Sequence, residues 1–132
     1  MQEKKFVTVI NCMDGRVQEP VIRWMKENYG AQFVDMITEP GPEKILAERG
    51  DRDLVASIKK RVEISVHKHG SVHVAVAGHF DCAGNPCGKE EKLGQIRQAA
   101  ETVRSWNMQV NVIELWIGSD WQVQKVKEHA TL

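Results

Sequence analysis

Short β-rich segments alternate with segments of helical periodicity along this chain, and this alternation limits the folds that it can adopt. The β-rich segments lie at residues 6–11, 33–37, 72–77 and 110–117. The clearest helical segment follows the second of them, with an apolar residue at every fourth position: Leu54, Ile58, Val62 and Val66. Strands separated by helices pair in parallel through right-handed crossovers. The pattern therefore predicts an α/β layered fold built on a mainly parallel sheet.

Turn and capping residues place the remaining elements. A helix follows the first β-rich segment and ends near Gly30, and a turn is predicted at residues 39–42. A further amphipathic helix is predicted around residues 93–103. A final helix is predicted near the C-terminus, capped by Ser119 or Asp120 and carrying the apolar Val123 and Val126.

Composition and charge exclude several classes of protein without identifying a function. The 132 residues, 42% hydrophobic and 27% charged, are typical of one soluble globular domain, here predicted to span residues 1–132. Lys and Arg number 18, as do Asp and Glu, so neither a nucleic-acid nor an anionic membrane partner is indicated. No segment resembles a signal peptide or a membrane span, and we expect a cytoplasmic protein.

Unusual side chains follow two of the predicted strands. The sequence Cys-Met-Asp-Gly-Arg occupies residues 12–16, and Gly-His-Phe-Asp-Cys occupies residues 78–82. If these strands are neighbours, both motifs face one crevice at the carboxyl edge of the sheet. Cys12, His79 and Cys82 would then offer two thiolates and one imidazole, a ligand set that suits zinc. Two close ligands and one distant ligand are more typical of a catalytic than of a structural zinc.

The fourth zinc position has two possible occupants. Asp14 lies two residues after Cys12 and could bind the metal itself, which would close the site. Arg16 could instead hold the Asp14 carboxylate in a bidentate pair, and a water molecule could then bind zinc and lose a proton near neutral pH. The residues alone leave both arrangements open.

The two motifs resemble those of the β-class carbonic anhydrases, which carry Cys-x-Asp-x-Arg and, later in the chain, Gly-His-x-x-Cys. The likeness covers about residues 7–83. It implies a three-layer sandwich with a mainly parallel sheet of four or five strands and a homodimer or higher homo-oligomer. It also implies zinc on Cys12, His79 and Cys82, with Asp14 and Arg16 as catalytic residues. The implied reaction is reversible hydration of carbon dioxide to bicarbonate by zinc-bound hydroxide.

The chain also departs from this family. The first predicted strand of this sequence begins at about residue 6, whereas the family usually has helices before that strand. Thr-Glu-Pro-Gly-Pro at residues 38–42 replaces the usual Arg-Asn-x-Gly-Asn. The glycine that usually follows the second cysteine is displaced to Gly84. These differences keep two alternatives open: a zinc-binding protein without hydration activity, in a regulatory or assembly role, and a hydrolase of carbon disulfide or carbonyl sulfide.

A third alternative uses the remaining cysteine. Cys87 follows Cys82 by five residues across a turn-like segment, so the two thiols could form a redox pair if their Cα atoms lie within roughly 7 Å. No basic residue obviously lowers the pKa of Cys87, and we favour the simpler interpretation that this thiol has no chemical role.

Overall fold

The computed structural model describes residues 4–131, so Met1, Gln2, Glu3 and Leu132 of the predicted domain lie outside the described residues. It contains a five-stranded sheet with the strand order β2-β1-β3-β4-β5. The first four strands are parallel, and β5 is antiparallel to β4. The strands are β1 (Phe6–Cys12), β2 (Phe33–Glu39), β3 (His73–His79), β4 (Asn111–Ile117) and β5 (Val123–His129). The helices are α1 (Gln18–Tyr29), α2 (Pro42–Glu48), α3 (Arg52–His69) and α4 (Lys89–Arg104).

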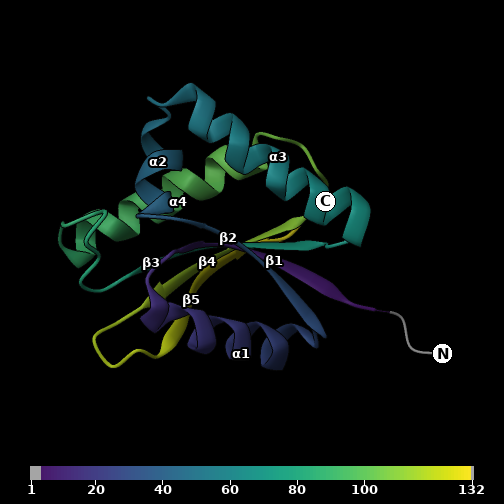
Figure 1. Ribbon diagram of the computed structural model, residues 1–132, viewed down its shortest axis with the longest axis horizontal. Helices are drawn as coiled ribbons and strands as arrows, with labels where there is room; N and C mark the ends of the chain where they lie inside the picture. The colour runs from purple at the N-terminus through teal and green to yellow at the C-terminus, as the bar shows by residue number, and fades with distance from the viewer. Residues whose placement is uncertain (1–3, 132) are drawn as a thin grey trace.

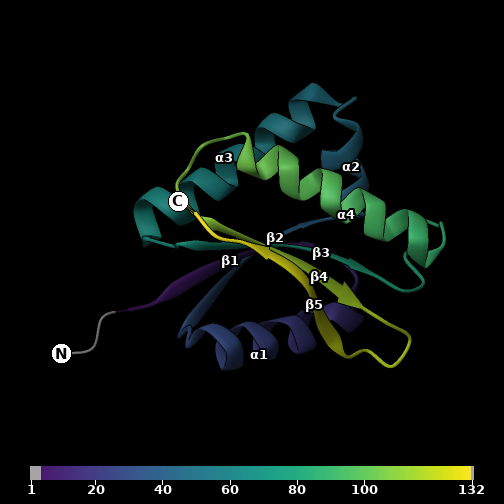
Figure 2. The same ribbon diagram turned by 180° about the vertical axis from the view of Figure 1, so that it is seen from behind.

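The helices cover both faces of the sheet and make a three-layer sandwich (Figures 1 and 2). Helix α1 lies on one face, and α2, α3 and α4 lie on the other. Successive side chains of a strand point to opposite faces. Val7 and Val9 of β1 accordingly pack in the cluster beneath α1 with Met25, whereas Ile10 packs in the other cluster with Ile58 of α3. The predicted fold class is confirmed.

Helix α3 illustrates how local sequence determines an element. The carboxylate of Asp51 accepts a hydrogen bond from the backbone N–H of Leu54 at 3.0 Å, which caps the first turn. Ile58 and Val62 are fully buried. Gly70 ends the helix with a φ of 73°, in the left-handed region that glycine adopts without a steric penalty. The predicted helical segment is confirmed, and its apolar residues all pack in or against one core cluster: Leu54, Ile58, Val62 and Val66.

The predicted C-terminal helix is wrong, because Val123–His129 form the edge strand β5. The backbone N–H of Trp121 donates to the carbonyl oxygen of Gly118 at 2.9 Å, and Asp120 accepts from the backbone N–H of Gln122. These bonds form a turn that leads the chain back along β4. Val123 and Val126 are spaced as on a helix, but the side chain of Val126 is exposed. Pairing with the open edge of β4 outweighed a weak helical pattern.

Helix α2 was missed at the sequence level. The predicted turn at residues 39–42 leads directly into it, with Pro42 as its first residue. Gly41 precedes this proline with a φ of 64°, and its Cα lies against the 84–85 segment, where a Cβ would come within 2.8 Å of Asn85 Cβ. Seven residues provide too few periodic positions to distinguish a short helix from a turn.

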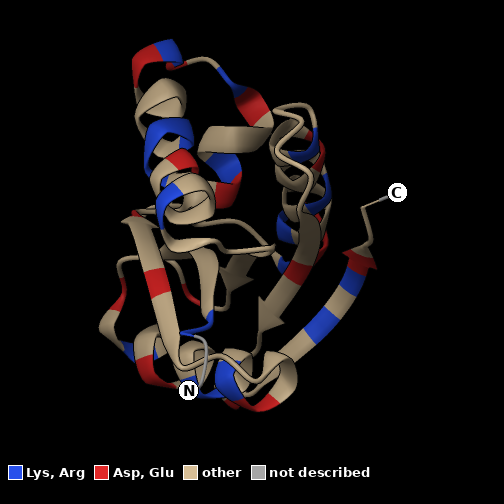
Figure 3. Cartoon of the chain, turned by 90° about the vertical axis from the view of Figure 1, so that its right-hand side faces the viewer, with Lys and Arg blue, Asp and Glu red and all other residues tan. Residues whose placement is uncertain are grey.

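Residues of both charge signs are interspersed along the helices and β5 in the view shown (Figure 3). This distribution agrees with the balanced composition. Within residues 4–131, no helix combines the length and the apolar character required to cross a lipid bilayer.

The strand order places a topological switch point between β1 and β3. The chain leaves β1 through α1 toward β2 on one side, and it leaves β3 through α4 toward β4 on the other. The pairing of β1 with β3 runs from Thr8↔Val74 to Ile10↔Val76, so it stops before either strand ends. The carboxyl ends of both strands therefore lie at a switch point of the kind where α/β proteins form their sites.

Candidate metal centre

The first motif begins at the end of β1 and is held by side chains of its own segment. The Nε2 amide of Gln18 donates to the carbonyl oxygens of Cys12 and Asp14, at 2.8 and 2.9 Å. The buried Asn11 donates to the carbonyl oxygen of Val17 at 3.1 Å. These bonds fix a tight turn, and the Cys12 side chain remains 4% exposed in the core.

The second motif follows β3 and is anchored to the neighbouring strand. The backbone N–H of Phe80 donates to the carbonyl oxygen of Ile117 at 2.9 Å, immediately after His79. Asp81 then adopts a positive φ of 58°, which turns the chain back so that Cys82 also points into the core. Gln95 accepts from Asn85 at 2.7 Å and ties the following loop to α4.

The structure brings Cys12, His79 and Cys82 together, as the sequence predicts. Their ligand atoms all lie within 4.8 Å of one another, and all three side chains are buried. The two sulfur atoms are 3.7 Å apart. Two sulfurs bound to one tetrahedral zinc at about 2.3 Å would lie roughly 3.8 Å apart. The pair therefore already has the spacing of zinc-bound thiolates.

The His79 ring is oriented as a metal ligand would be. Its Nδ1 lies 2.7 Å from the carbonyl oxygen of Phe80, and because a carbonyl only accepts, Nδ1 carries the proton. In the neutral ring this leaves the lone pair on Nε2. Nε2 is buried and has no hydrogen-bond partner among the described residues. A buried nitrogen without a partner is costly unless a ligand satisfies it, so the residues present fit a metal ion.

The two thiols differ in acidity. Burial raises the pKa of Cys12, but the neighbouring His79 and hydrogen bonds from the backbone at Gly41 and Asp14 outweigh it, and the net pKa falls to about 7. Burial, together with the nearby Cys12, raises the pKa of Cys82 to about 11. One thiolate is therefore accessible near neutral pH, and the second requires the charge of a metal ion.

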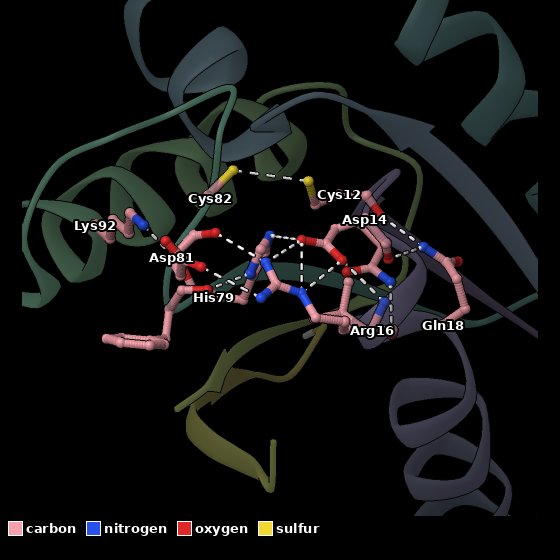
Figure 4. A network of polar contacts seen from close by, with 11 residues as sticks. Cys12, Asp14, Arg16, Gln18, His79, Asp81, Cys82 and Lys92 are labelled. Atoms are coloured by element: carbon pink, nitrogen blue, oxygen red, sulfur yellow. Dashed lines mark hydrogen bonds and ion pairs between the residues drawn. The ribbon is translucent and has the colours of Figure 1, made fainter. Parts of the chain in front are cut away.

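Asp14 and Arg16 form the ion pair that the sequence allowed (Figure 4). Nε of Arg16 lies 3.1 Å from Oδ1 of Asp14, and its terminal NH2 nitrogen lies 2.7 Å from Oδ2. The hydrogen bonds from Arg16 lower the pKa of Asp14 to about 2. Oδ2 of Asp14 lies 4.0 Å from Nε2 of His79. The carboxylate thus stands beside the three ligand atoms while Arg16 holds it.

Two buried charged residues behind the ligands were missed at the sequence level. Lys92 is 2% exposed, and its Nζ donates to the carbonyl oxygen of His79 at 2.8 Å. Glu43 of α2 is fully buried, and neither of its oxygens has a hydrogen-bond partner within residues 4–131. Burial raises its pKa. Lys and Glu side chains usually lie at the protein surface, so no pattern in the sequence indicated that these two would be buried.

Cys87 lies outside the ligand group. Its thiol points to Oδ1 of Asn85, at 3.4 Å. The sulfur of Cys82 instead lies close to the sulfur of Cys12. Burial and the nearby Glu91 raise the pKa of Cys87. A thiol with a raised pKa is a poor nucleophile, so the structure adds nothing in favour of a Cys82–Cys87 redox pair.

The fold is similar to that of solved β-carbonic anhydrases. Two tetrameric β-carbonic anhydrases from the filamentous ascomycete Sordaria macrospora provide one match, with a TM-score of 0.56 and 16% identity, over 98% of this chain and 84% of that chain. A β-carbonic anhydrase of the fungal pathogen Aspergillus fumigatus matches with a TM-score of 0.50 and 16% identity, over 96% of this chain and 76% of that chain. At these identities the likeness concerns the fold.

The chain belongs to the family described as "Putative carbonic anhydrase", whose sequence model matches residues 2–127. The sequence matches no curated protein. The buried Cys-His-Cys group is consistent with the zinc site of β-carbonic anhydrases.

Proposed function

We propose that this protein is a zinc-dependent carbonic anhydrase that hydrates carbon dioxide reversibly to bicarbonate. The observation that carries the proposal is that a buried ligand group and a paired carboxylate lie side by side at one strand switch point. Cys12, His79 and Cys82 present three buried ligand atoms within 4.8 Å, and the paired carboxylate of Asp14 lies 4.0 Å from the ligand nitrogen of His79.

Cys12, His79 and Cys82 would hold the metal, and the carboxylate of Asp14 lies beside these ligand atoms. Bound zinc supplies a Lewis acid that makes water nucleophilic near neutral pH. Two thiolates balance the two positive charges of the ion, so the site as a whole would carry little net charge. Such a site admits a neutral, apolar substrate without the strong electrostatic preference for anions that a cationic site would have.

Asp14 and Arg16 would orient the reacting water. A carboxylate with a pKa of about 2 stays ionised throughout the neutral range, so Asp14 accepts hydrogen bonds well and binds protons poorly. Arg16 directs both carboxylate oxygens, which sets the direction from which Asp14 accepts. We infer that the pair positions a water molecule rather than storing its proton.

Exposed apolar side chains within the two motifs offer contacts suited to carbon dioxide. Met13 and Phe80 are each adjacent in sequence to a ligand and are 62% and 47% exposed. The ring of Trp121 packs edge-on to that of Phe80, with 6.4 Å between centroids. Carbon dioxide has no net dipole, so dispersion contacts of this kind favour its approach.

The test measures zinc content and hydration on the same sample. We expect about one zinc per chain and stopped-flow hydration well above a zinc-free blank, with both lost in Cys12→Ser. Asp14→Ala should keep its zinc but hydrate much more slowly. Full zinc occupancy without hydration between pH 7 and 9 would overturn the proposal and favour a non-catalytic zinc protein. Turnover of carbon disulfide or carbonyl sulfide in the same sample would reassign the substrate.

We further propose a cytoplasmic homodimer or larger homo-oligomer. Its support is the tetrameric state of the Sordaria macrospora enzymes and, in this chain, the exposed Phe33 on the edge strand β2. Light scattering after size exclusion tests the assembly, since a strictly monomeric mass at micromolar concentration contradicts it. The location is supported by the sequence argument alone, and fractionation of cells that express the full-length protein tests it.

A further inference from the structure

Arg16 makes more contacts than its pairing with Asp14 requires (Figure 4). Its NH1 nitrogen lies 3.3 Å from Oδ2 of Asp81, and its NH2 nitrogen donates to the main-chain oxygen of Asp81 at 3.1 Å. Its guanidinium carbon lies 4.5 Å from the centre of the Trp121 ring. The guanidinium group is thus held at two edges and one face.

These additional contacts come from separate parts of the chain. Asp81 lies within the second motif, between the ligands His79 and Cys82, and Trp121 lies in the turn between β4 and β5. Both residues have a positive φ, of 58° and 59°, which is uncommon for residues other than glycine. At Asp81 this conformation accompanies the presentation of both the carboxylate and the carbonyl oxygen to the same guanidinium group.

The two carboxylates use different edges of Arg16. The Asp14 carboxylate accepts hydrogen bonds from Nε and NH2 of Arg16. Asp81 accepts from NH1 through its carboxylate and from NH2 through its main-chain oxygen. Because each edge carries its own N–H groups, Asp81 does not have to compete with Asp14 for a donor. The two contacts can therefore act together in fixing the plane of the guanidinium group.

An arginine in this position requires such support. The side chain is 46% exposed, and a long exposed side chain loses conformational freedom when it is held in one geometry. A single exposed ion pair compensates this loss poorly. Contacts with Asp81 and with the Trp121 ring help to offset the conformational entropy that Arg16 loses. They keep Nε directed at Asp14.

We propose that Asp81 and Trp121 are positioning residues that fix Arg16 so that it holds Asp14 in a single orientation. The proposal rests on the proposed function only for the catalytic consequence, because the fixing of Arg16 is a structural claim with its own measurement. It assigns roles to a variable position of the second motif and to the β4–β5 turn, which lies far from both motifs in the sequence.

Nuclear magnetic resonance of the Arg16 side chain tests the structural claim on the zinc-loaded protein. We expect the heteronuclear NOE of the Nε–H group to show a rigid side chain in the wild type. It should fall in Asp81→Asn, which tolerates the positive φ, and in Trp121→Leu, but less in Trp121→Phe, which keeps an aromatic face. The matched control is Glu19→Gln, an exposed carboxylate on α1. An Arg16 side chain that stays equally rigid in Asp81→Asn and Trp121→Leu overturns the proposal.

Hydration kinetics test the consequence through a double-mutant cycle with Arg16→Gln. We expect Asp81→Asn to lower kcat/KM roughly 2- to 5-fold in the wild type, as for a partly exposed ion pair, and to change it little once Arg16 is absent. An equal loss in both backgrounds would mean that Asp81 acts on the loop of Cys82 instead, and it would overturn the proposal. If the wild type holds zinc but does not hydrate carbon dioxide, the proposed function fails, and the resonance measurement still decides the role of these residues.

Discussion

The buried ammonium group of Lys92 donates a hydrogen bond to the main-chain oxygen of His79, at 2.8 Å. The contact joins α4 to the end of β3 directly behind a ligand of the candidate metal centre. Helix α4 is thereby tied to the strand by a charged hydrogen bond as well as by apolar packing.

Removing this donor should destabilise the protein. Lys92→Met keeps most of the apolar stem but leaves the carbonyl of His79 without its donor, and we expect the free energy of unfolding to fall by about 1–3 kcal/mol. Urea denaturation measures the change. Lys60→Met, at an exposed position of α3, should stay within about 0.5 kcal/mol of the wild type. A stabilised Lys92→Met variant would show that desolvation of the ammonium group outweighs its hydrogen bond.

Glu43 should make stability depend on pH. Burial raises its pKa in the folded state, so the folded protein retains this proton at a pH where the unfolded chain has lost it. The contribution of Glu43 to stability is then fully present below the unfolded pKa, about 4.3, and is lost as pH rises, by at most ~1.4 kcal/mol per pH unit. Glu43→Gln lacks this loss, so its stability relative to the wild type should increase from pH 5 to pH 8.

Urea denaturation at several pH values measures this difference for Glu43. Glu48→Gln is the matched control, since Glu48 lies on the same helix α2 but is exposed. A stability difference between Glu43→Gln and the wild type that stays constant across this range would contradict a raised pKa.

Gly78 and Gly94 should respond in opposite directions to alanine. A Cβ at Gly78 would lie 2.6 Å from Oε2 of Glu43 and 2.8 Å from Cδ1 of Ile96, both buried, so Gly78→Ala should cost about 1–3 kcal/mol. A Cβ at Gly94, inside α4, has no neighbour within 4 Å, and Gly94→Ala should stabilise by about 0.5–1 kcal/mol. Thermal unfolding compares the two variants. A neutral Gly78→Ala would mean that Glu43 moves aside easily.

Zinc binding should release protons and depend on two of the three cysteines. The pKa of Cys82 is about 11, so its thiol is protonated at pH 8 and must lose its proton on binding, which gives a release of about one proton per zinc or more. Calorimetry in two buffers of different ionisation enthalpy measures this number. Cys82→Ser should lose tight binding and Cys87→Ser should keep it, and equal loss in both would place Cys87 in the site.

The ligand group could be predicted from the sequence because its chemistry is local to two strand ends. Cys12 follows one β-rich segment and His79 and Cys82 follow another, so the parallel arrangement alone brought them to one edge of the sheet. Whether these strands are neighbours depended on topology, which periodicity does not determine. The structure shows that β1 and β3 are neighbours.

The surroundings of the ligand group could not be predicted, because each depends on contacts between distant segments. Trp121 reaches Arg16 only because the chain turns at residues 118–121 into an edge strand, where a helix had been predicted. The burial of Glu43 requires α2, which is too short to be seen in the sequence pattern. Local motifs were therefore more predictable than the residues that support them.

The separation of the ligands along the chain links metal occupancy to the folding of most of the protein. Cys12 and Cys82 are 70 positions apart, and the segment between them includes α1, β2, α2, α3 and β3. An ion that joins them acts as a removable cross-link around that segment, which by loop-closure entropy restricts the unfolded chain by up to about 4 kcal/mol at 25 °C. A nascent chain cannot complete the ligand set until β3 has emerged and docked beside β1. A chain that retains the metal would then be one in which β1 and β3 have paired correctly.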